Sequence, residues 1–473
     1  MKNPTSYRPK YHFTAKKGWI NDPNGMIYFK GNYHMFYQHN PYSATWDSMH
    51  WGHAISKDGI VWEHLPVALK PDMPYDDYKH GGCFSGTAIE HEGKLYLFYT
   101  GSHDKNKTEC QTQNVAISED GIHFKKYEGN PIISKLPHEE SSWDIRDPKV
   151  FRHKDTFYML LGTCQGNQET DGIGKILMYE SKDLLHWDYK SIFFDTEGIY
   201  GKMVECPDLF PLEDKWILMY SPMYAVSKKK VIYFCGDIDF EIGKFIVKSQ
   251  GDVNNGFEFY APQSFQGENG EVYGVAWMDA WQNMPWFHKL APTENEEYRG
   301  CMSLLRRYFF NEKEELCALP IDAYEKARIT SKSYENVSLS KEKLYFDVGS
   351  DNRYELIIKT DIRNMTSSFF TIGLMANEED GIYLHMDLIS NILTFDRNHL
   401  NEHSVGMMST KLDISNFQLE LRIFVDVSTI EIFADGGKVN LSYTAYPREE
   451  QRKLWINVPY GTGSVDKLEI HQM

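Results

Sequence analysis

The fold is decided by the nine-residue stretch Ala54-Ile55-Ser56-Lys57-Asp58-Gly59-Ile60-Val61-Trp62 and by two near-copies of it further along the chain. The copies are Ala116-Ile117-Ser118-Glu119-Asp120-Gly121-Ile122-His123-Phe124 and Tyr179-Glu180-Ser181-Lys182-Asp183-Leu184-Leu185-His186-Trp187. Each copy contains a Ser-x-Asp sequence and ends in an aromatic residue, and in two of them Asp-Gly marks a hairpin turn. A turn of this kind between apolar runs is typical of two strands of one sheet.

A second set of short motifs opens each repeating unit. The motifs are Asp22-Pro23-Asn24-Gly25, Phe84-Ser85-Gly86, Asp147-Pro148-Lys149, Glu205-Cys206-Pro207-Asp208 and Tyr260-Ala261-Pro262. Successive motifs lie about 60 residues apart, the last interval being somewhat shorter. Several short strands per unit at this period predict a five-bladed β-propeller. The innermost strand of every blade lines the central channel, so we expect the opening motifs to meet there.

The repeat ends near residue 320, and alternating strand patterns follow from about Tyr345, with a hairpin signal at Asp435-Gly436. We therefore expect an all-β chain, with a five-bladed β-propeller at residues 1–322 followed by a C-terminal β-sandwich at residues 345–473. Residues 323–344 are expected to be a connector, ordered in part.

Composition restricts the class of protein. The chain has 50 Lys and Arg against 67 Asp and Glu, a net charge of −17, which argues against nucleic acid or an anionic membrane surface as a partner. No apolar run reaches membrane-spanning length. The seven cysteines are scattered and never spaced C-x-x-C, which predicts neither a disulfide framework nor a zinc site. With no apolar signal-peptide region at the N-terminus, these features favour a reducing cytoplasm.

Asp22, Asp147 and Glu205 lie at the same place in the repeat, each within the motif that opens its unit. Taken singly, an Asp-Pro pair is an ordinary turn former. If they converge on one channel, however, the three carboxylates suit glycoside hydrolysis. In that reaction one ionised carboxylate attacks the sugar or activates water, and one protonated carboxyl group donates its proton to the leaving oxygen. Burial and like-charge repulsion can separate their pKa values.

With these motifs in place, the sequence resembles glycoside hydrolase family 32, the invertase and fructan hydrolase family. The resemblance is carried by Trp19-Ile20-Asn21-Asp22-Pro23-Asn24-Gly25, Phe84-Ser85-Gly86, Arg146-Asp147-Pro148 and Glu205-Cys206-Pro207-Asp208, in that order. It continues through Phe259-Tyr260-Ala261-Pro262 and Ala276-Trp277-Met278 to Val425-Asp426-Val427-Ser428-Thr429-Ile430-Glu431-Ile432-Phe433. The sequence departs from the family's pattern at two places. One is Leu304-Leu305-Arg306-Arg307 in the last blade, where the position of the strand end is therefore not predicted, and the other is Val427 in the sandwich motif.

The resemblance implies a retaining mechanism that needs no metal and no organic cofactor. Asp22 would be the nucleophile, Glu205 the general acid and then the general base, and Asp147 a non-covalent carboxylate that binds sugar hydroxyls and is kept ionised by Arg146. The residues expected to shape the fructose pocket are Asn21, Gln38, Trp46, Phe84, Ser85, Arg146, Tyr260 and Trp277.

Cleavage of the terminal β-D-fructofuranosyl bond of sucrose or sucrose 6-phosphate is the predicted reaction, with small sugars, including short fructo-oligosaccharides, as the binding partners. A fructan exo-hydrolase for inulin or levan, a fructosyltransferase and a non-catalytic carbohydrate-binding propeller are the alternatives. Residues 42–53 resemble the sucrose-6-phosphate hydrolases of the family, so we expect the phosphate ester to be the better substrate. Lys79 and His80 are candidates to meet the phosphate at the rim. The sequence predicts no oligomeric state.

Overall fold

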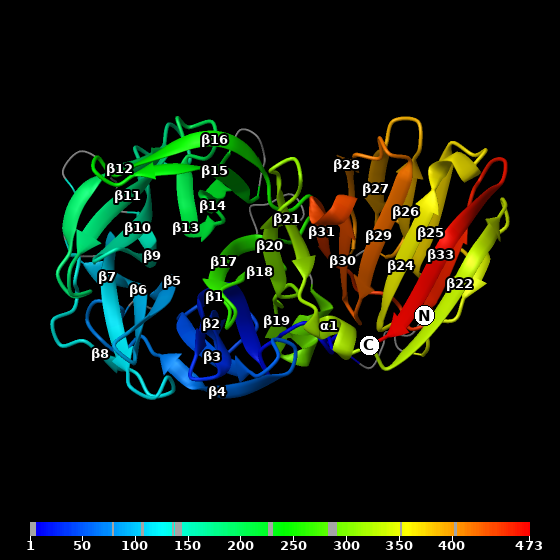
Figure 1. Cartoon of the computed structure of the whole chain (residues 1–473). Coiled ribbons are helices and arrows are strands. Elements are labelled where there is room, and N and C mark those ends of the chain that lie inside the picture. Colours follow the sequence, from blue (N-terminus) through cyan, green and yellow to red (C-terminus); the bar gives the residue numbers. More distant parts are fainter. Residues whose placement is uncertain are drawn as a thin grey trace.

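The computed structural model describes residues 6–473 except 78–79, 106–107, 135–136, 138–143, 226–229, 282–290, 351 and 402–403. Its described part consists of a ring of small sheets beside a two-sheet sandwich (Figure 1). The all-β prediction is confirmed, since strands greatly outnumber the short helical turns α1 (Ala323–Lys326), η1 (Pro292–Glu296), η2 (Ile362–Asn364) and η3 (Asp435–Gly437). Within these described residues, no helix is long and apolar enough to cross a membrane.

Five antiparallel sheets form the blades of the propeller. The first three are β1 (Gly18–Phe29), β2 (Asn32–Asn40), β3 (His50–Ser56) and β4 (Trp62–Leu69); β5 (Gly82–His91), β6 (Lys94–Lys105), β7 (Thr108–Ser118) and β8 (Lys125–Lys126); and β9 (Ile145–His153), β10 (Thr156–Gln165), β11 (Ile173–Ser181) and β12 (Asp188–Asp195). The last two are β13 (Met203–Leu212), β14 (Lys215–Met223), β15 (Ile232–Asp239) and β16 (Lys244–Asp252); and β17 (Tyr260–Gln266), β18 (Val272–Trp277), β20 (Arg306–Phe310) and β21 (Leu316–Pro320). The short strand β19 (Tyr298–Arg299) pairs in parallel with β1 and so ties the last blade to the first.

The repeated Ser-x-Asp sequence forms the same turn in three blades. In the first blade the Ser56 hydroxyl accepts from the Gly59 amide at 2.9 Å, and Asp58 Oδ1 accepts from the next two amides at 2.9 Å each. The hydrogen bonds recur around Ser118 and Asp120 and around Ser181 and Asp183. The side chains satisfy amides that the turn leaves without backbone partners, which is why the motif recurs at each such turn.

All five innermost strands contain an irregularity at the opening motif. The pairing of β1, β5, β9, β13 and β17 with the next strand shifts register at Asp22, at Ser85, at Asp147, at Cys206 and at Ala261. Such bulges re-aim side chains, and Pro is tolerated in them because no ladder hydrogen bond is lost. Three of the residues have a positive φ: Asp147 at 62°, Cys206 at 47° and Ala261 at 50°.

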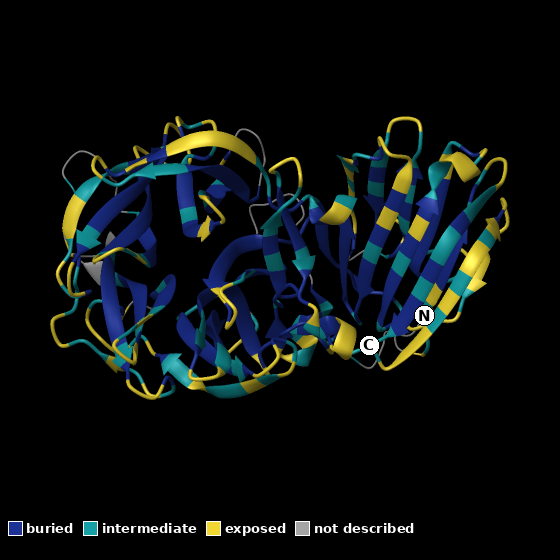
Figure 2. Cartoon of the chain, viewed as in Figure 1, coloured by how far each residue is buried: buried dark blue, intermediate teal, exposed yellow. Residues whose placement is uncertain are grey.

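Apolar side chains fill the spaces between neighbouring blades (Figure 2). The inner strands are largely buried, whereas the outer strands β12 and β16 are partly exposed and the outer strand β21 is buried. The inner strands β1, β5, β9, β13 and β17 contact one another in sequence around the ring, and β17 contacts β1 to close it. The five opening motifs therefore surround one axis.

The sandwich has two six-stranded sheets around a large apolar core. One sheet has the order β22 (Thr330–Leu339), β33 (Gly463–Gln472), β24 (Tyr354–Asp361), β29 (Gln418–Val425), β30 (Thr429–Ala434) and β31 (Val439–Thr444). The other has the order β23 (Leu344–Phe346), β32 (Lys453–Asn457), β25 (Phe369–Ala376), β26 (Ile382–Asp387), β27 (Ile392–Asp396) and β28 (Met407–Lys411). The hairpin expected at Asp435-Gly436 joins β30 to β31.

The structure differs from the expectation at residues 323–344. Ten of its residues form β22, an edge strand that pairs with β33, so α1 and its flanks connect the two parts. The polar composition of β22 hid the strand, because an edge strand exposes most of its side chains. The sequence did not predict where the strand near Arg306 ends. In the structure, β20 begins at Arg306 and pairs with β21.

Candidate active site

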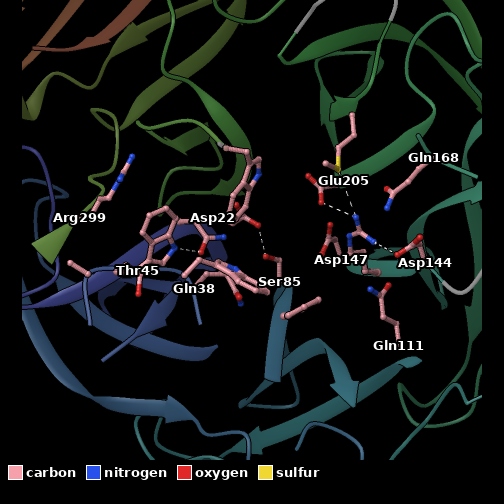
Figure 3. Close-up of a pocket in the computed structure, with 18 residues that line it drawn as sticks. Asp22, Gln38, Thr45, Ser85, Gln111, Asp144, Asp147, Gln168, Glu205 and Arg299 are labelled. Carbon is pink, nitrogen blue, oxygen red and sulfur yellow. Dashed lines mark hydrogen bonds and ion pairs between the residues drawn. The ribbon is translucent and has the colours of Figure 1, made fainter. Parts of the chain in front are cut away.

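A cavity of about 530 Å³ opens at the centre of the propeller. The opening motifs contribute Asp22, Phe84, Ser85, Asp147 and Glu205 to its lining, and Asn21 and Arg146 come directly before two of them. The other lining residues are Trp19, Gln38, Ala44, Thr45, Trp46, Gln111, Asp144, Gln168, Met223, Trp281 and Arg299. The structure thus brings together the three predicted carboxylates, which lie 125 or 58 residues apart in the chain (Figure 3).

The two oxygens of Asp22 have different surroundings. Oδ2 accepts from the Ser85 hydroxyl at 2.6 Å and lies 3.4 Å from the Cys206 thiol. Oδ1 is covered from solvent and has no hydrogen-bond partner among the described residues. Burial raises the pKa of Asp22, the Ser85 hydrogen bond opposes this, and the charge of Glu205 adds to it. One oxygen of the carboxyl group is therefore held in place, and the other is left without a hydrogen-bond partner among the described residues.

Asp147 lies under the same cavity and is 6% exposed. Its backbone amide donates to Thr100 Oγ1 at 3.0 Å, and its Oδ2 accepts from the Cys206 amide at 2.8 Å. Burial raises the pKa of Asp147 to about 7, although the neighbouring Arg146 guanidinium lowers it. The Arg146 guanidinium thus favours the ionised form of Asp147, and burial, the larger effect, opposes it.

Arg146 instead holds Glu205. Its Nη2 donates to Glu205 Oε1 at 2.9 Å, and its Nη1 donates to Asp144 Oδ1 at 3.0 Å. The Tyr260 hydroxyl donates to Glu205 Oε2 at 2.6 Å. Both oxygens of Glu205 are thus fixed by donors from neighbouring blades, and nearby negative charge and burial raise the pKa of Tyr260 well above its ordinary value.

Of the eight residues expected to shape a fructose pocket, six line the cavity and two lie behind it. Trp46 is 37% exposed near Phe84, with ring centroids 6.1 Å apart. Gln38 donates to the Cys83 carbonyl at 2.9 Å. Tyr260 and Trp277 are not among the lining residues: Tyr260 supports Glu205, and Trp277, fully buried, packs edge-on against Trp19 at 5.7 Å.

Several lining residues were not predicted. Gln111, Asp144 and Gln168 come from strand ends and a turn outside the recurring motifs, and Arg299 comes from the two-residue strand β19. Asp144 could have been found, because it lies three residues before the Asp147 motif position. The others carry no sequence signal, since ring closure alone brings them to the axis.

The structure also locates other side chains that could bind a phosphate group or a metal ion. His80 Nδ1 lies 3.2 Å from Asp47 Oδ1 and is not in the cavity lining, and Lys79 lies outside the described residues. His34 and His53 are hydrogen-bonded to each other at 3.0 Å in a buried stack. Across the described ranges there is no cluster of three or more His, Cys, Asp or Glu side chains placed to hold a metal ion.

Comparison with known proteins agrees with this geometry. The chain matches the glycosyl hydrolases family 32 N-terminal domain over residues 12–320 and the family's C-terminal domain over residues 323–472. A sucrose-6-phosphate hydrolase of Escherichia coli is 32% identical, with 96% of this chain and 93% of that protein covered. A levanase of Bacillus subtilis is also 32% identical, covering 99% of this chain and 70% of the levanase.

Solved structures of the same family superpose over nearly the whole chain. A sucrose-6-phosphate hydrolase from Lactobacillus gasseri gives a TM-score of 0.85 at 27% identity, covering 99% of this chain and 94% of that one. A mutant of the Bombyx mori GH32 β-fructofuranosidase in complex with sucrose gives 0.80 at 28% identity, with the same coverage. Together with the two matched domains and the carboxylate-lined cavity, these likenesses show that the chain belongs to glycosyl hydrolase family 32.

Proposed function

We propose that this chain is a retaining β-fructofuranosidase that cleaves the terminal fructosyl bond of sucrose or sucrose 6-phosphate by double displacement. The observation that carries the proposal is the arrangement at Asp22. Asp22 lines the same cavity as Glu205. One of its carboxylate oxygens is held by Ser85, and the other has no hydrogen-bond partner among the described residues. A retaining glycosidase needs such a pair of carboxyl groups in one site.

In the first step a carboxylate oxygen of Asp22 attacks the anomeric carbon of the fructosyl group. The bond from that carbon to the glycosidic oxygen breaks, and the protonated Glu205 gives its proton to the departing oxygen. The Ser85 hydroxyl and the Cys206 thiol hold Oδ2, so the carboxylate needs little reorientation to attack. Cys206 itself is no nucleophile here, because burial and nearby carboxylates raise its pKa well above the ordinary thiol value.

In the second step water hydrolyses the fructosyl–Asp22 ester. Glu205, now ionised, takes a proton from the water as the oxygen attacks the anomeric carbon, and Asp22 leaves as a carboxylate. Arg146 and Tyr260 keep the Glu205 carboxyl group in one position through both steps. Asp147 binds sugar hydroxyls and, when ionised, favours the positively charged transition state.

The substrate assignment is supported by the likeness to several sucrose-6-phosphate hydrolases. The cavity lining gives less support to the phosphate ester than the relatives do. Among its described lining residues, the two cations are Arg146 and Arg299, and both already bind carboxylates. A cytoplasmic location is part of the proposal and is supported by the seven cysteines, all of which are free.

Steady-state kinetics on four substrates tests the proposal. We expect turnover of sucrose and sucrose 6-phosphate, a higher kcat/KM for the phosphate ester at matched ionic strength, and much slower release of fructose from inulin and levan. An equal or higher kcat/KM for sucrose would make the protein a plain invertase. Faster release from levan would favour the exo-hydrolase suggested by the levanase likeness, and no release of fructose from any of the four would overturn the proposal.

A further inference from the structure

Beyond Glu205 and Arg146 the cavity ends in a polar wall. The wall consists of Gln111, Asp144 and Gln168, which lie on the far side of Glu205 and Asp147 from Asp22 in Figure 3. Gln111 lies on β7, Asp144 just before β9, and Gln168 in the turn after β10. Within the described part of the chain, Asp22 and Glu205, which do the proposed chemistry, form no hydrogen bond or ion pair with these three residues. The wall therefore has a role separate from holding the two catalytic carboxyl groups.

The proposed reaction fixes which part of a substrate would reach this wall. Asp22 attacks one side of the anomeric carbon, and Glu205 protonates the oxygen that departs on the other side. The leaving group must therefore extend past Glu205, away from Asp22. The wall lies in that direction, so its side chains face the leaving group rather than the fructosyl group.

Two of the three wall residues already have partners. Asp144 Oδ1 accepts from Arg146 at 3.0 Å, and Gln111 Oε1 accepts from the Ile145 amide at 2.9 Å. Gln168 differs, because its Oε1 is covered from solvent and has no hydrogen-bond partner in the described structure. A covered acceptor without a partner is unfavourable in the free protein. The terminal torsion of a Gln side chain is only loosely constrained, so the carboxamide can turn toward the cavity that Gln168 lines and meet a ligand that brings a donor.

The turn that carries Gln168 is held without its side chain. The Gly172 amide donates to the Asn167 carbonyl at 2.7 Å, the Thr170 amide donates to the same carbonyl at 3.1 Å, and the Asn167 amide donates to Asp171 at 3.2 Å. The Gln168 carboxamide is therefore not needed to build the turn, and its position facing the cavity calls for another explanation.

We propose, building on the proposed function, that Gln168 is a specificity-determining residue that hydrogen-bonds a hydroxyl of the hexosyl leaving group. A sugar hydroxyl can donate to Gln168 Oε1 and accept from its amide, whereas a phosphate dianion offers acceptors only. With the Asp144 carboxylate beside it, this wall suits hydroxyls and disfavours direct contact with a phosphate. The phosphate of sucrose 6-phosphate would then be directed elsewhere.

The test compares the Gln168→Ala variant with wild type on substrates that differ only in the leaving group. For sucrose we expect kcat/KM to fall about three- to ten-fold, the effect of one neutral hydrogen bond. For methyl β-D-fructofuranoside, whose leaving group cannot reach the wall, we expect a change of less than about two-fold. Sucrose 6-phosphate should lose about the same factor as sucrose, because the bond is to a hydroxyl that both share.

Glu169→Ala is the matched control, since Glu169 is an exposed neighbour in the same turn, and it should leave all three values unchanged. An equal loss on the methyl glycoside would mean that Gln168 acts on the site as a whole, and an unchanged value for sucrose would mean that it makes no contact; either result overturns the inference. A loss confined to sucrose 6-phosphate would place the phosphate at Gln168 and also overturn it. These failures differ from failure of the proposed function, in which the wild-type protein releases no fructose.

Discussion

At the residue scale, Asp22 and Glu205 have different proposed duties in one cavity, one covalent and one in proton transfer. We expect Asp22→Ala and Glu205→Ala each to lower kcat by several orders of magnitude while the folded structure persists. The measurement is steady-state turnover of sucrose, with circular dichroism to show that the variants are folded. An Asp22→Ala variant that keeps more than about a tenth of the wild-type kcat would rule out Asp22 as the nucleophile.

Asp147 makes a pH-dependent contribution to stability. Its pKa in the folded protein is raised to about 7, well above the ordinary value. Between about pH 4 and pH 7 the folded state therefore binds a proton that the unfolded state has released, so the free energy of unfolding falls as pH rises through this window. Asn cannot ionise, and it tolerates the positive φ of this position.

We therefore expect Asp147→Asn to be more stable than wild type at pH 8, by about 1–4 kcal/mol, and nearly equal to it at pH 4. Its kcat should fall sharply at both pH values. Urea denaturation at the two pH values measures the difference. A stability difference that does not change with pH would show that burial does not penalise the charged form of Asp147.

The sequence predicted the carboxylates for a physical reason. Asp22, Asp147 and Glu205 occupy equivalent positions in repeating units, and such positions must converge in a propeller. It did not predict that Tyr260 and Trp277 lie behind the cavity, because a motif position fixes the strand and not the direction of a large ring. Gln168 gave no signal, since it lies in the turn after β10, outside the recurring motifs.

At the element scale, the repeated turn after the third strand shows one exception. Gly59 and Gly121 have φ values of 78° and 81°, and Leu184 takes the equivalent position with a φ of 68°. A left-handed Leu costs about 1–2 kcal/mol. Leu184 is fully buried in the core between the second and third blades, and removing such a side chain costs about 3–5 kcal/mol.

Burial should outweigh backbone strain at this turn. We expect Leu184→Gly to lower the free energy of unfolding by about 1–3 kcal/mol, even though Gly is the residue that the other two units use. Thermal denaturation of the variant beside wild type measures the change. A variant more stable than wild type would show that the left-handed conformation dominates.

At the scale of the whole molecule, a buried polar cluster joins the two parts of the chain. His12, from the segment before β1, contacts Asp426 and Glu431 of the sandwich at 3.1 Å each. Arg306 of the last blade also binds Glu431. Hydrogen bonds to the two acids outweigh burial and raise the pKa of His12 to about 8. We propose that the chain divides near residue 322 and that this cluster fastens the two domains.

The cluster predicts a loss of stability in mild alkali. His12 has a higher pKa in the folded than in the unfolded protein, so its contribution is fully present below about pH 6.5 and is lost as pH rises through about 8. We expect the free energy of unfolding to fall by about 2 kcal/mol between pH 6 and pH 9 from this group. His12→Asn should remove that part of the pH dependence. The same pH profile in wild type and variant would contradict the assignment.

The central claim is that fructosyl transfer proceeds through Asp22 with retention. Proton NMR during the first turnovers of sucrose tests this most directly, because the anomer released first reports the stereochemistry before mutarotation mixes the products. Double displacement through Asp22 predicts that β-D-fructofuranose appears first. Initial release of the α-anomer would mean a single displacement by water, and it would contradict the proposed role of Asp22.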